Sequence, residues 1–186
     1  MGFLAWPLET NRIRRDVTNN TFGTVRRNAD GTKRDHQGWD LVATPLTACY
    51  AIADGVIRKR EDHDAKGHGK LVVLEFLFQG RTLFALYSHL SIASVARGTK
   101  VTQGEVIAYT GTSGNANGMT GEDQHLHFEI RNELEAGRGL SGRVDPQTLY
   151  GRAPREYAIV ESHGQKRLLK SSGAGLKINA QDMRRW

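Results

Sequence analysis

Two histidines stand two residues apart in the segment DQHLHFEIR, which covers residues 123–131. If this segment is a β-strand, its side chains alternate between two faces, so His125 and His127 share one face and Leu126 and Phe128 the other. Residues two apart on one face are roughly 6.5 to 7 Å apart along the strand. Both imidazoles can therefore converge on one metal ion, or one can bind the ion while the other lies beside it. The pair alone does not define a metal site.

Two further segments carry residues of related chemistry. In HQGWD, His36 precedes Asp40 by four residues; both can chelate one ion if the chain curls between them, which Gly38 permits, but the pattern alone is weak evidence. In YSHL, His89 ends a strongly apolar stretch, where a lone histidine is more often an ordinary polar residue than a catalyst. Two histidines and one carboxylate, with a fourth position left for water, form a known catalytic zinc set. Zinc suits imidazole and carboxylate ligands, whereas calcium and magnesium require more oxygen ligands.

The same residue types indicate a hydrolase. Zinc lowers the pKa of a bound water to about 7 and polarises a carbonyl group. A further group must take the proton of this water and steady the oxyanion, and histidines that do not bind the metal can do so. This chemistry requires that the three segments meet in the folded chain.

The elements that must position these residues are predicted to be strands. Apolar, β-branched and aromatic runs, separated by Asp-Gly and Gln-Gly turns, predict strands over 38–43, 49–59, 71–78, 81–90, 106–109 and 124–131. Short turns between neighbouring strands favour antiparallel pairing. We expect a mostly β fold, as two packed sheets or one open curved sheet, with few short helices, one of them over 132–140. The polar loop 111–123 is expected either to contact substrate or to serve as a flexible connection.

Length and charge suggest one main domain with two flanking segments. A chain of 186 residues can bury one sizeable core. We expect a lead-in segment over 1–20, the main domain over 21–150 and a basic tail over 151–186. The tail holds eight Lys and Arg against three acids, nearly all of the formal net charge of +6. Such a tail either favours an anionic partner or only aids solubility. It lacks the interleaved aromatic and basic residues of nucleic-acid readers, so we expect no nucleic-acid partner.

Cysteine content and hydropathy argue against disulfide-bonded, thiolate-zinc and membrane-spanning proteins. Cys49 is the one cysteine, so neither an internal disulfide nor a thiolate zinc site can form, and its apolar surroundings predict a small buried residue. No run reaches the roughly 18 apolar residues of a transmembrane helix, so we expect no membrane span. The N-terminal residues show no classical export signal.

Taken in order, the motifs resemble those of the lysostaphin-type, or LytM-like, zinc endopeptidases. The matching segments are FGTVR (22–26), HQGWD (36–40), YAIADGVI (50–57), GHG (67–69), YSHL (87–90), VTQGEVIAYTGTSG (101–114) and HLHFEI (125–130). The resemblance covers roughly residues 20 to 150 and implies a mostly antiparallel β fold with a groove over a zinc site. The chain departs from the family at PLTAC (45–49), where members often have Gly-Thr-Pro, and at Gln124, where many have Pro.

The resemblance also implies roles for single residues. By likeness to the family, His36, Asp40 and His127 are ligands of one Zn²⁺ ion, and His89 and His125 are catalytic; no substrate-binding residue is assigned. The implied activity is that of a zinc metalloendopeptidase that hydrolyses peptide cross-links of bacterial peptidoglycan. The alternative is a catalytically inactive relative that binds peptidoglycan or activates an amidase, although such relatives usually lose ligands that this chain keeps.

The resemblance suggests where the protein acts. Some similar proteins are antibacterial toxins delivered by a contractile secretion apparatus, or phage lysins. We therefore expect action on peptidoglycan peptide stems in the periplasm or cell wall. Without a classical export signal, we expect one of two cases: the sequence is that of a mature form, or the protein is made in the cytoplasm and delivered by a non-classical or contractile secretion route. A toxin of this kind would require a cognate inhibitor, or immunity protein, in the producing cell.

Overall fold

The computed structural model describes residues 3–64, 66–163 and 184–185. Its strands are β1 (Thr10–Asn11), β2 (Gly23–Arg27), β3 (Lys33–His36), β4 (Trp39–Val42), β5 (Ala48–Tyr50), β6 (Gly55–Glu61), β7 (Leu71–Phe78), β8 (Arg81–Ser88), β9 (Leu90–Ala93), β10 (Lys100–Val101), β11 (Val106–Thr110), β12 (His125–Arg131), β13 (Arg143–Val144), β14 (Ile159–Val160) and β15 (Arg184–Arg185). Its helical turns are η1 (Arg14–Asp16), η2 (Thr18–Asn20), η3 (Gly114–Ala116), η4 (Gly121–Asp123) and α1 (Gln147–Tyr150).

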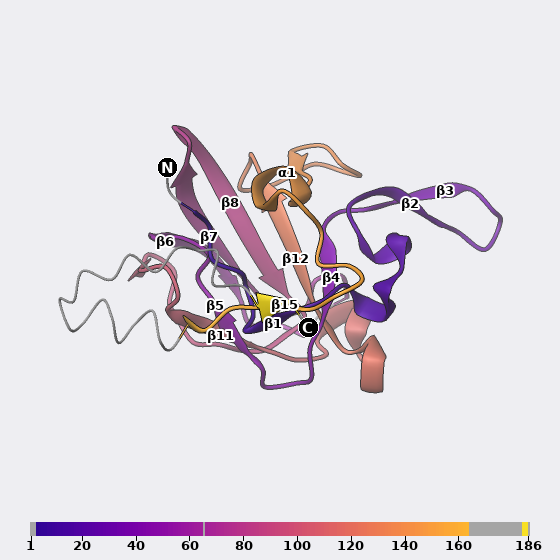
Figure 1. Ribbon diagram of the computed structural model, residues 1–186, viewed down its shortest axis with the longest axis horizontal. Coiled ribbons are helices and arrows are strands. Elements are labelled where there is room, and N and C mark those ends of the chain that lie inside the picture. The colour runs from indigo at the N-terminus through magenta and orange to yellow at the C-terminus, as the bar shows by residue number, and fades with distance from the viewer. Residues whose placement is uncertain (1–2, 65, 164–183, 186) are drawn as a thin grey trace.

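The largest sheet has the strand order β10-β6-β7-β8-β12-β13, and β4 also pairs with β12. Three smaller sheets join β1-β14-β15, β5-β11-β9 and β2-β3. All pairings among the described residues are antiparallel. The prediction of a mostly β, antiparallel fold with few short helices is therefore confirmed. In Figure 1, β8 and β12 lie side by side, and the β2–β3 hairpin projects from the body of the protein beyond β4.

The turn Gln79-Gly80 joins the two longest strands, as predicted. Both residues have positive φ angles, 50° and 77°, and Phe78 pairs directly with Arg81. Two consecutive residues with positive φ are typical of the type I′ turn, whose twist matches that of the flanking strands. The turn therefore sets the register of β7 and β8, and through β8 the register of β12.

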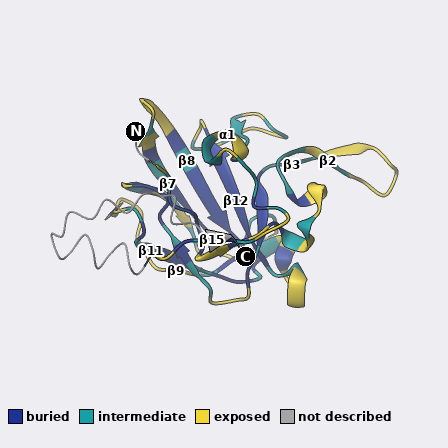
Figure 2. Cartoon of the chain, in the orientation of Figure 1, coloured by how far each residue is buried: buried dark blue, intermediate teal, exposed yellow. Residues whose placement is uncertain are grey.

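Strand β12 has the two faces that its alternation predicts. Leu126, Phe128 and Ile130 are fully buried in the hydrophobic core, and Figure 2 shows β8 and β12 as largely buried strands. The register places His127 opposite Asp40 of β4 on one side and opposite Ser88 of β8 on the other. The apolar face thus anchors the strand while the opposite face presents its polar residues toward β4 and the end of β8.

Parts of both predicted flanking segments pack onto the main sheet. Trp6 stacks on Trp39 with ring centroids 5.9 Å apart, and Ile13 is also buried in the core. Strand β14, from the predicted tail, pairs with β1, and Ile159 is buried. Most of the tail, residues 164–183 and 186, lies outside the described residues, so the boundaries at 20 and 150 stay predictions.

The short helix expected over 132–140 is wrong. These residues form bends and turns instead. The Nη1 atom of Arg143 donates hydrogen bonds to the carbonyl oxygens of Gly137, Gly139 and Ser141, at 2.7, 3.0 and 3.1 Å. The carbonyl oxygen of Gly137 thus accepts from a guanidinium rather than from the backbone N–H of Ser141, as it would in an α-helix, and two glycines further disfavour helix.

Two expectations from composition can be compared with the fold. Cys49 is buried, and burial raises the pKa of its thiol, as expected for a small core residue. Among the residues that the structure describes, no helix is long and apolar enough to cross a membrane.

Candidate metal centre

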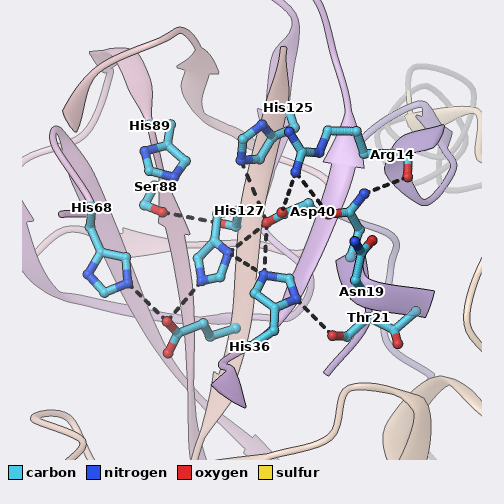
Figure 3. A network of polar contacts seen from close by, with 12 residues as sticks. Arg14, Asn19, Thr21, His36, Asp40, His68, Ser88, His89, His125 and His127 are labelled. Carbon is cyan, nitrogen blue, oxygen red and sulfur yellow. Dashed lines mark hydrogen bonds and ion pairs between the residues drawn. The ribbon is translucent and has the colours of Figure 1, made fainter. Parts of the chain in front are cut away.

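Three donor atoms from distant parts of the chain converge at one point. His36 Nε2 lies 3.0 Å from Asp40 Oδ1 and 3.3 Å from His127 Nδ1, and His127 Nδ1 lies 2.8 Å from the same carboxylate oxygen. Figure 3 shows the three side chains pointing toward one another. All three residues are buried. Ligands bound at 2.0–2.1 Å around a tetrahedral ion lie about 3.3 Å apart, so this donor set fits a metal ion.

The turn between β3 and β4 brings His36 and Asp40 together. His36 ends β3 and Asp40 is the second residue of β4, with Gln37 and Gly38 between the strands. A Cβ atom at Gly38 would lie 2.1 Å from the carbonyl oxygen of Phe128. Only glycine therefore allows this turn to approach β12, the strand that carries His127.

The second ring nitrogen of each of the two histidines has an acceptor. His36 Nδ1 donates to the carbonyl oxygen of Thr21 at 2.8 Å. His127 Nε2 lies 3.0 Å from Oε1 of Glu129. Such partners orient an imidazole and leave its other nitrogen free for a metal ion.

The two carboxylate oxygens of Asp40 have different partners: one faces the donor set and the other faces two arginines. Its Oδ1 atom faces the histidines, while Oδ2 accepts from Arg26 at 2.5 Å and from Arg14 at 3.5 Å. Burial alone would raise the pKa of Asp40, but hydrogen bonds with His127 and His36 hold it well below its usual range. Asp40 is thus ionised, as a metal ligand must be.

His89 and His125 lie beside the donor set. The rings of His89 and His125 are 5.1 Å apart, and His89 is 6.0 Å from His127 between ring centroids. His89 Nδ1 donates to the carbonyl oxygen of Ser113 at 2.9 Å, and His125 Nδ1 to that of Asp123 at 2.7 Å. These backbone bonds leave the Nε2 atoms of both histidines available in the cleft. The Nε2 atom of His125 lies 3.6 Å from Asp40 Oδ1.

The surroundings set different protonation states for these histidines. Burial alone would lower the pKa of His127, but hydrogen bonds with Asp40 and Glu129 raise it to about 9. Burial, together with the neighbouring His127 and His125, lowers the pKa of His89 to about 3. Burial also lowers the pKa of His125. His89 and His125 are therefore neutral near pH 7, as a group that accepts a proton must be.

The structure thus brings together all five residues singled out in the sequence. Strand spacing left both His125 and His127 as candidate ligands. The geometry favours His127, whose Nδ1 atom belongs to the converging set, over His125. The assignment of roles to these five residues remains a proposal.

Sequence reasoning missed a second group on the same face. His68 Nε2 lies 3.0 Å from Glu129 Oε1, and Glu129 Oε2 accepts from Arg131 at 2.7 Å and Arg143 at 2.8 Å. His68, His127 and Glu129 offer donor atoms close enough for a second ion. Two guanidinium groups on one carboxylate make this site electropositive, so a second cation is disfavoured and the group is better suited to orient His127. The alternation of β12 placed Glu129 on this face, but only the fold reveals its partners.

A large cleft opens over these residues. Its volume is about 1180 Å³, and it is lined by His36, Asp40, His89, His125 and His127 together with His68 and the β2–β3 hairpin. Typical small-molecule sites measure about 300–1,000 Å³. The cleft is thus somewhat larger than such sites, in line with the groove expected from the sequence.

An antiparallel β fold with a carboxylate, two converging histidines and two neutral histidines in one cleft defines a site of the metallopeptidase class. Residues 34–144 match Peptidase family M23, and the chain belongs to this family. The resemblance stated from the sequence is therefore confirmed.

Curated relatives and solved structures agree with this assignment. The chain is 32% identical over 172 residues to an uncharacterized metalloprotease of Haemophilus influenzae, which covers 91% of this chain and 33% of that protein. It is 37% identical over 101 residues to the peptidoglycan DD-endopeptidase ShyA of Vibrio cholerae, covering 53% of this chain and 21% of that protein. The chain thus spans about a third or less of the length of these two relatives.

Among solved structures, a zinc containing peptidase from Vibrio cholerae superposes with a TM-score of 0.56 at 26% identity, over 70% of this chain and 36% of that one. The catalytic domain of the antimicrobial peptidase lysostaphin from Staphylococcus simulans gives a TM-score of 0.56 at 25% identity, over 71% of this chain and 90% of that one.

Proposed function

We propose that this chain is a zinc-dependent endopeptidase that hydrolyses peptide cross-links of bacterial peptidoglycan. The observation that carries the proposal is the convergence of His36 Nε2, Asp40 Oδ1 and His127 Nδ1 beside two neutral histidines. The zinc in a similar solved peptidase supports the choice of metal. The similar DD-endopeptidase ShyA supports the substrate class and action in the periplasm or cell wall.

Each residue would have a defined part in the reaction. His36, Asp40 and His127 would hold the zinc, with Thr21 and Glu129 orienting the two imidazoles. Bound zinc would supply a water of lowered pKa and polarise the scissile carbonyl.

His89 and His125 would work at the Nε2 atoms that their backbone hydrogen bonds leave free. One would take the proton of the attacking water at its neutral Nε2 atom; the other could donate a hydrogen bond from Nε2 to the carbonyl oxygen, where negative charge develops, only in its protonated form. The family's assignment of both residues as catalytic is compatible with either division of these roles.

The test is digestion of purified peptidoglycan by the zinc-loaded chain, followed by mass spectrometry of the muropeptides. Cross-linked dimers should decrease and monomers increase, and the masses identify the bond that is cut. His127→Ala should abolish the change. His63→Ala is the matched control, because the side chain of His63 is 59% exposed and does not line the cleft.

Intact cross-links in the presence of bound zinc would contradict the proposal. If the same preparation bound peptidoglycan or stimulated a wall amidase, the inactive, amidase-activating relative would be the better description.

The antibacterial role is a separate proposal that the family resemblance suggests. Expression directed to the periplasm of a susceptible bacterium should lyse the cells, whereas cytoplasmic expression should not. Co-expression of a cognate immunity protein should restore growth. Equal harm in both compartments would contradict a toxin that acts on the cell wall.

A further inference from the structure

The β2–β3 hairpin forms one wall of the cleft over the donor set. Its residues Arg26, Arg27, Lys33 and Arg34 all line the cleft. Figure 1 shows the hairpin projecting away from the sheet, so this wall stands apart from the hydrophobic core. The hairpin leads through His36 directly into the donor set.

The hairpin carries two cross-strand pairs of like charge. Arg26 pairs with Arg34, and Arg27 pairs with Lys33. Like charges directly opposite each other on a sheet are destabilising. An anion bound at this wall would relieve this repulsion.

Three of these four cations are exposed, and Arg26 is the exception. Arg26 forms an ion pair with Asp40 and donates a hydrogen bond to the carbonyl oxygen of Asn19. Arg27 is exposed and donates to the carbonyl oxygen of Gly31 in its own hairpin. The side chains of Lys33 and Arg34 are exposed, and within the described part of the chain they form no ion pair or hydrogen bond. Positive charge at the cleft is therefore available to a ligand.

Few acidic groups balance this charge. Of the residues that line the cleft, five are Lys or Arg, and two, Asp35 and Asp40, are acidic. Asp40 faces the donor set and Arg26. Asp35 accepts a hydrogen bond from Thr24 at 2.6 Å. The field in the cleft thus attracts anions, most strongly at low salt.

We propose that Arg27, Lys33 and Arg34 form a carboxylate-binding wall that selects acidic peptide substrates. This inference rests on the proposed function and names its substrate class. Peptide cross-links whose residues keep free carboxylates near the scissile bond are preferred over the same cross-links with these groups amidated. The preference comes from exposed ion pairs, so it weakens as ionic strength rises.

The experiment compares two synthetic cross-linked peptides that differ only in whether the carboxylates next to the scissile bond are free or amidated. The test variant carries Lys33→Gln and Arg34→Gln together. The matched control carries Arg97→Gln and Lys100→Gln, the same change in charge at two exposed residues that do not line the cleft. Values of kcat and KM are measured for the zinc-loaded proteins at low and high salt.

The test variant should lose about three- to tenfold in kcat/KM on the free-carboxylate peptide, through KM, because exposed ion pairs are individually weak. Its activity on the amidated peptide and the activity of the control variant should change less than twofold. Equal losses on both peptides, or an unchanged preference, would overturn the carboxylate-binding wall while leaving the proposed function intact.

Cleavage of neither peptide by the unmodified protein would count against the proposed function instead. In that case, the affinity of the protein for each of the two uncleaved peptides, measured by calorimetry, tests the carboxylate-binding wall on its own. Tighter binding of the free-carboxylate peptide that the test variant alone weakens supports the wall, and equal binding overturns it.

Discussion

His127 Nε2 lies 3.0 Å from Glu129 Oε1, two residues further along the same face of β12. The opposite ring nitrogen of His127 belongs to the donor set with His36 and Asp40. Burial alone would raise the pKa of Glu129, but its bonds with His127, His68 and Arg131 hold that pKa far below its usual range. Glu129 is therefore an ionised anchor that orients the ring of His127, so that Nδ1 faces His36 and Asp40.

Replacing this anchor should weaken metal binding. Glu129→Gln keeps the size of the side chain but removes its charge, and we expect metal affinity to fall about 10–100-fold, the range for partners of ligand histidines. Competition with a chromophoric chelator measures the affinity, and circular dichroism checks the fold. Glu75→Gln is the control, because it also removes a carboxylate bonded to an arginine, here the exposed Arg58. Unchanged affinity in a folded Glu129→Gln protein would show that Glu129 does not orient His127.

Metal binding should release a proton from His127 near neutral pH. Both ring nitrogens of His127 face carboxylate oxygens, and the pKa of His127 is raised to about 9, so the metal-free ring is protonated at pH 7. The ligand form is neutral, so the apparent affinity should rise about tenfold per pH unit from pH 6 toward pH 9 and then level off. Burial lowers the pKa of His36, so His36 is less protonated than His127 throughout this range. Calorimetry in buffers of different ionisation enthalpy counts the protons, and an affinity independent of pH would contradict this assignment.

The two histidines beside the donor set should affect catalysis without affecting metal content. His125→Ala and His89→Ala should each lower kcat by about 10²–10⁴-fold, the range for general acid–base groups, while zinc affinity changes only a few-fold. His89 has a φ of 60°, a conformation that asparagine tolerates better than alanine, so His89→Asn serves as a second variant that preserves the fold. A large loss of zinc in either variant would instead identify that histidine as a ligand.

The turn before Asp40 should tolerate no side chain at Gly38. An added Cβ would meet the carbonyl oxygen of Phe128 at 2.1 Å, so Gly38→Ala must push β4 away from β12. We expect the free energy of unfolding of the metal-free protein to fall by about 1–3 kcal/mol, as for other overpacked sites, together with weaker metal binding. His36→Ala provides the comparison, because it removes a proposed ligand without this clash. A Gly38→Ala protein with unchanged stability and metal affinity would show that the turn adapts.

The strands with strong apolar runs or clear apolar alternation were predictable, and the exposed β2–β3 hairpin was not. β7 and β12 match their predicted ranges closely, because each has a buried apolar face and β7 also ends at a strong turn. The β2–β3 hairpin was missed, because its cationic residues give no apolar signal. The helix expected over 132–140 failed because Arg143, outside the segment, binds its carbonyl oxygens.

The sequence by itself predicted which side chains would carry the chemistry, and it determined that His125 and His127 share a face, because alternation on a strand is a local property. It also identified His36, Asp40 and His89 through their likeness to one family. Only the tertiary structure decided how the two histidines differ. The partners of a ring nitrogen come from segments far apart in the chain, so which nitrogen is held by a carbonyl or carboxylate, and which is free, depends on the packing of β3, β4 and β8 against β12.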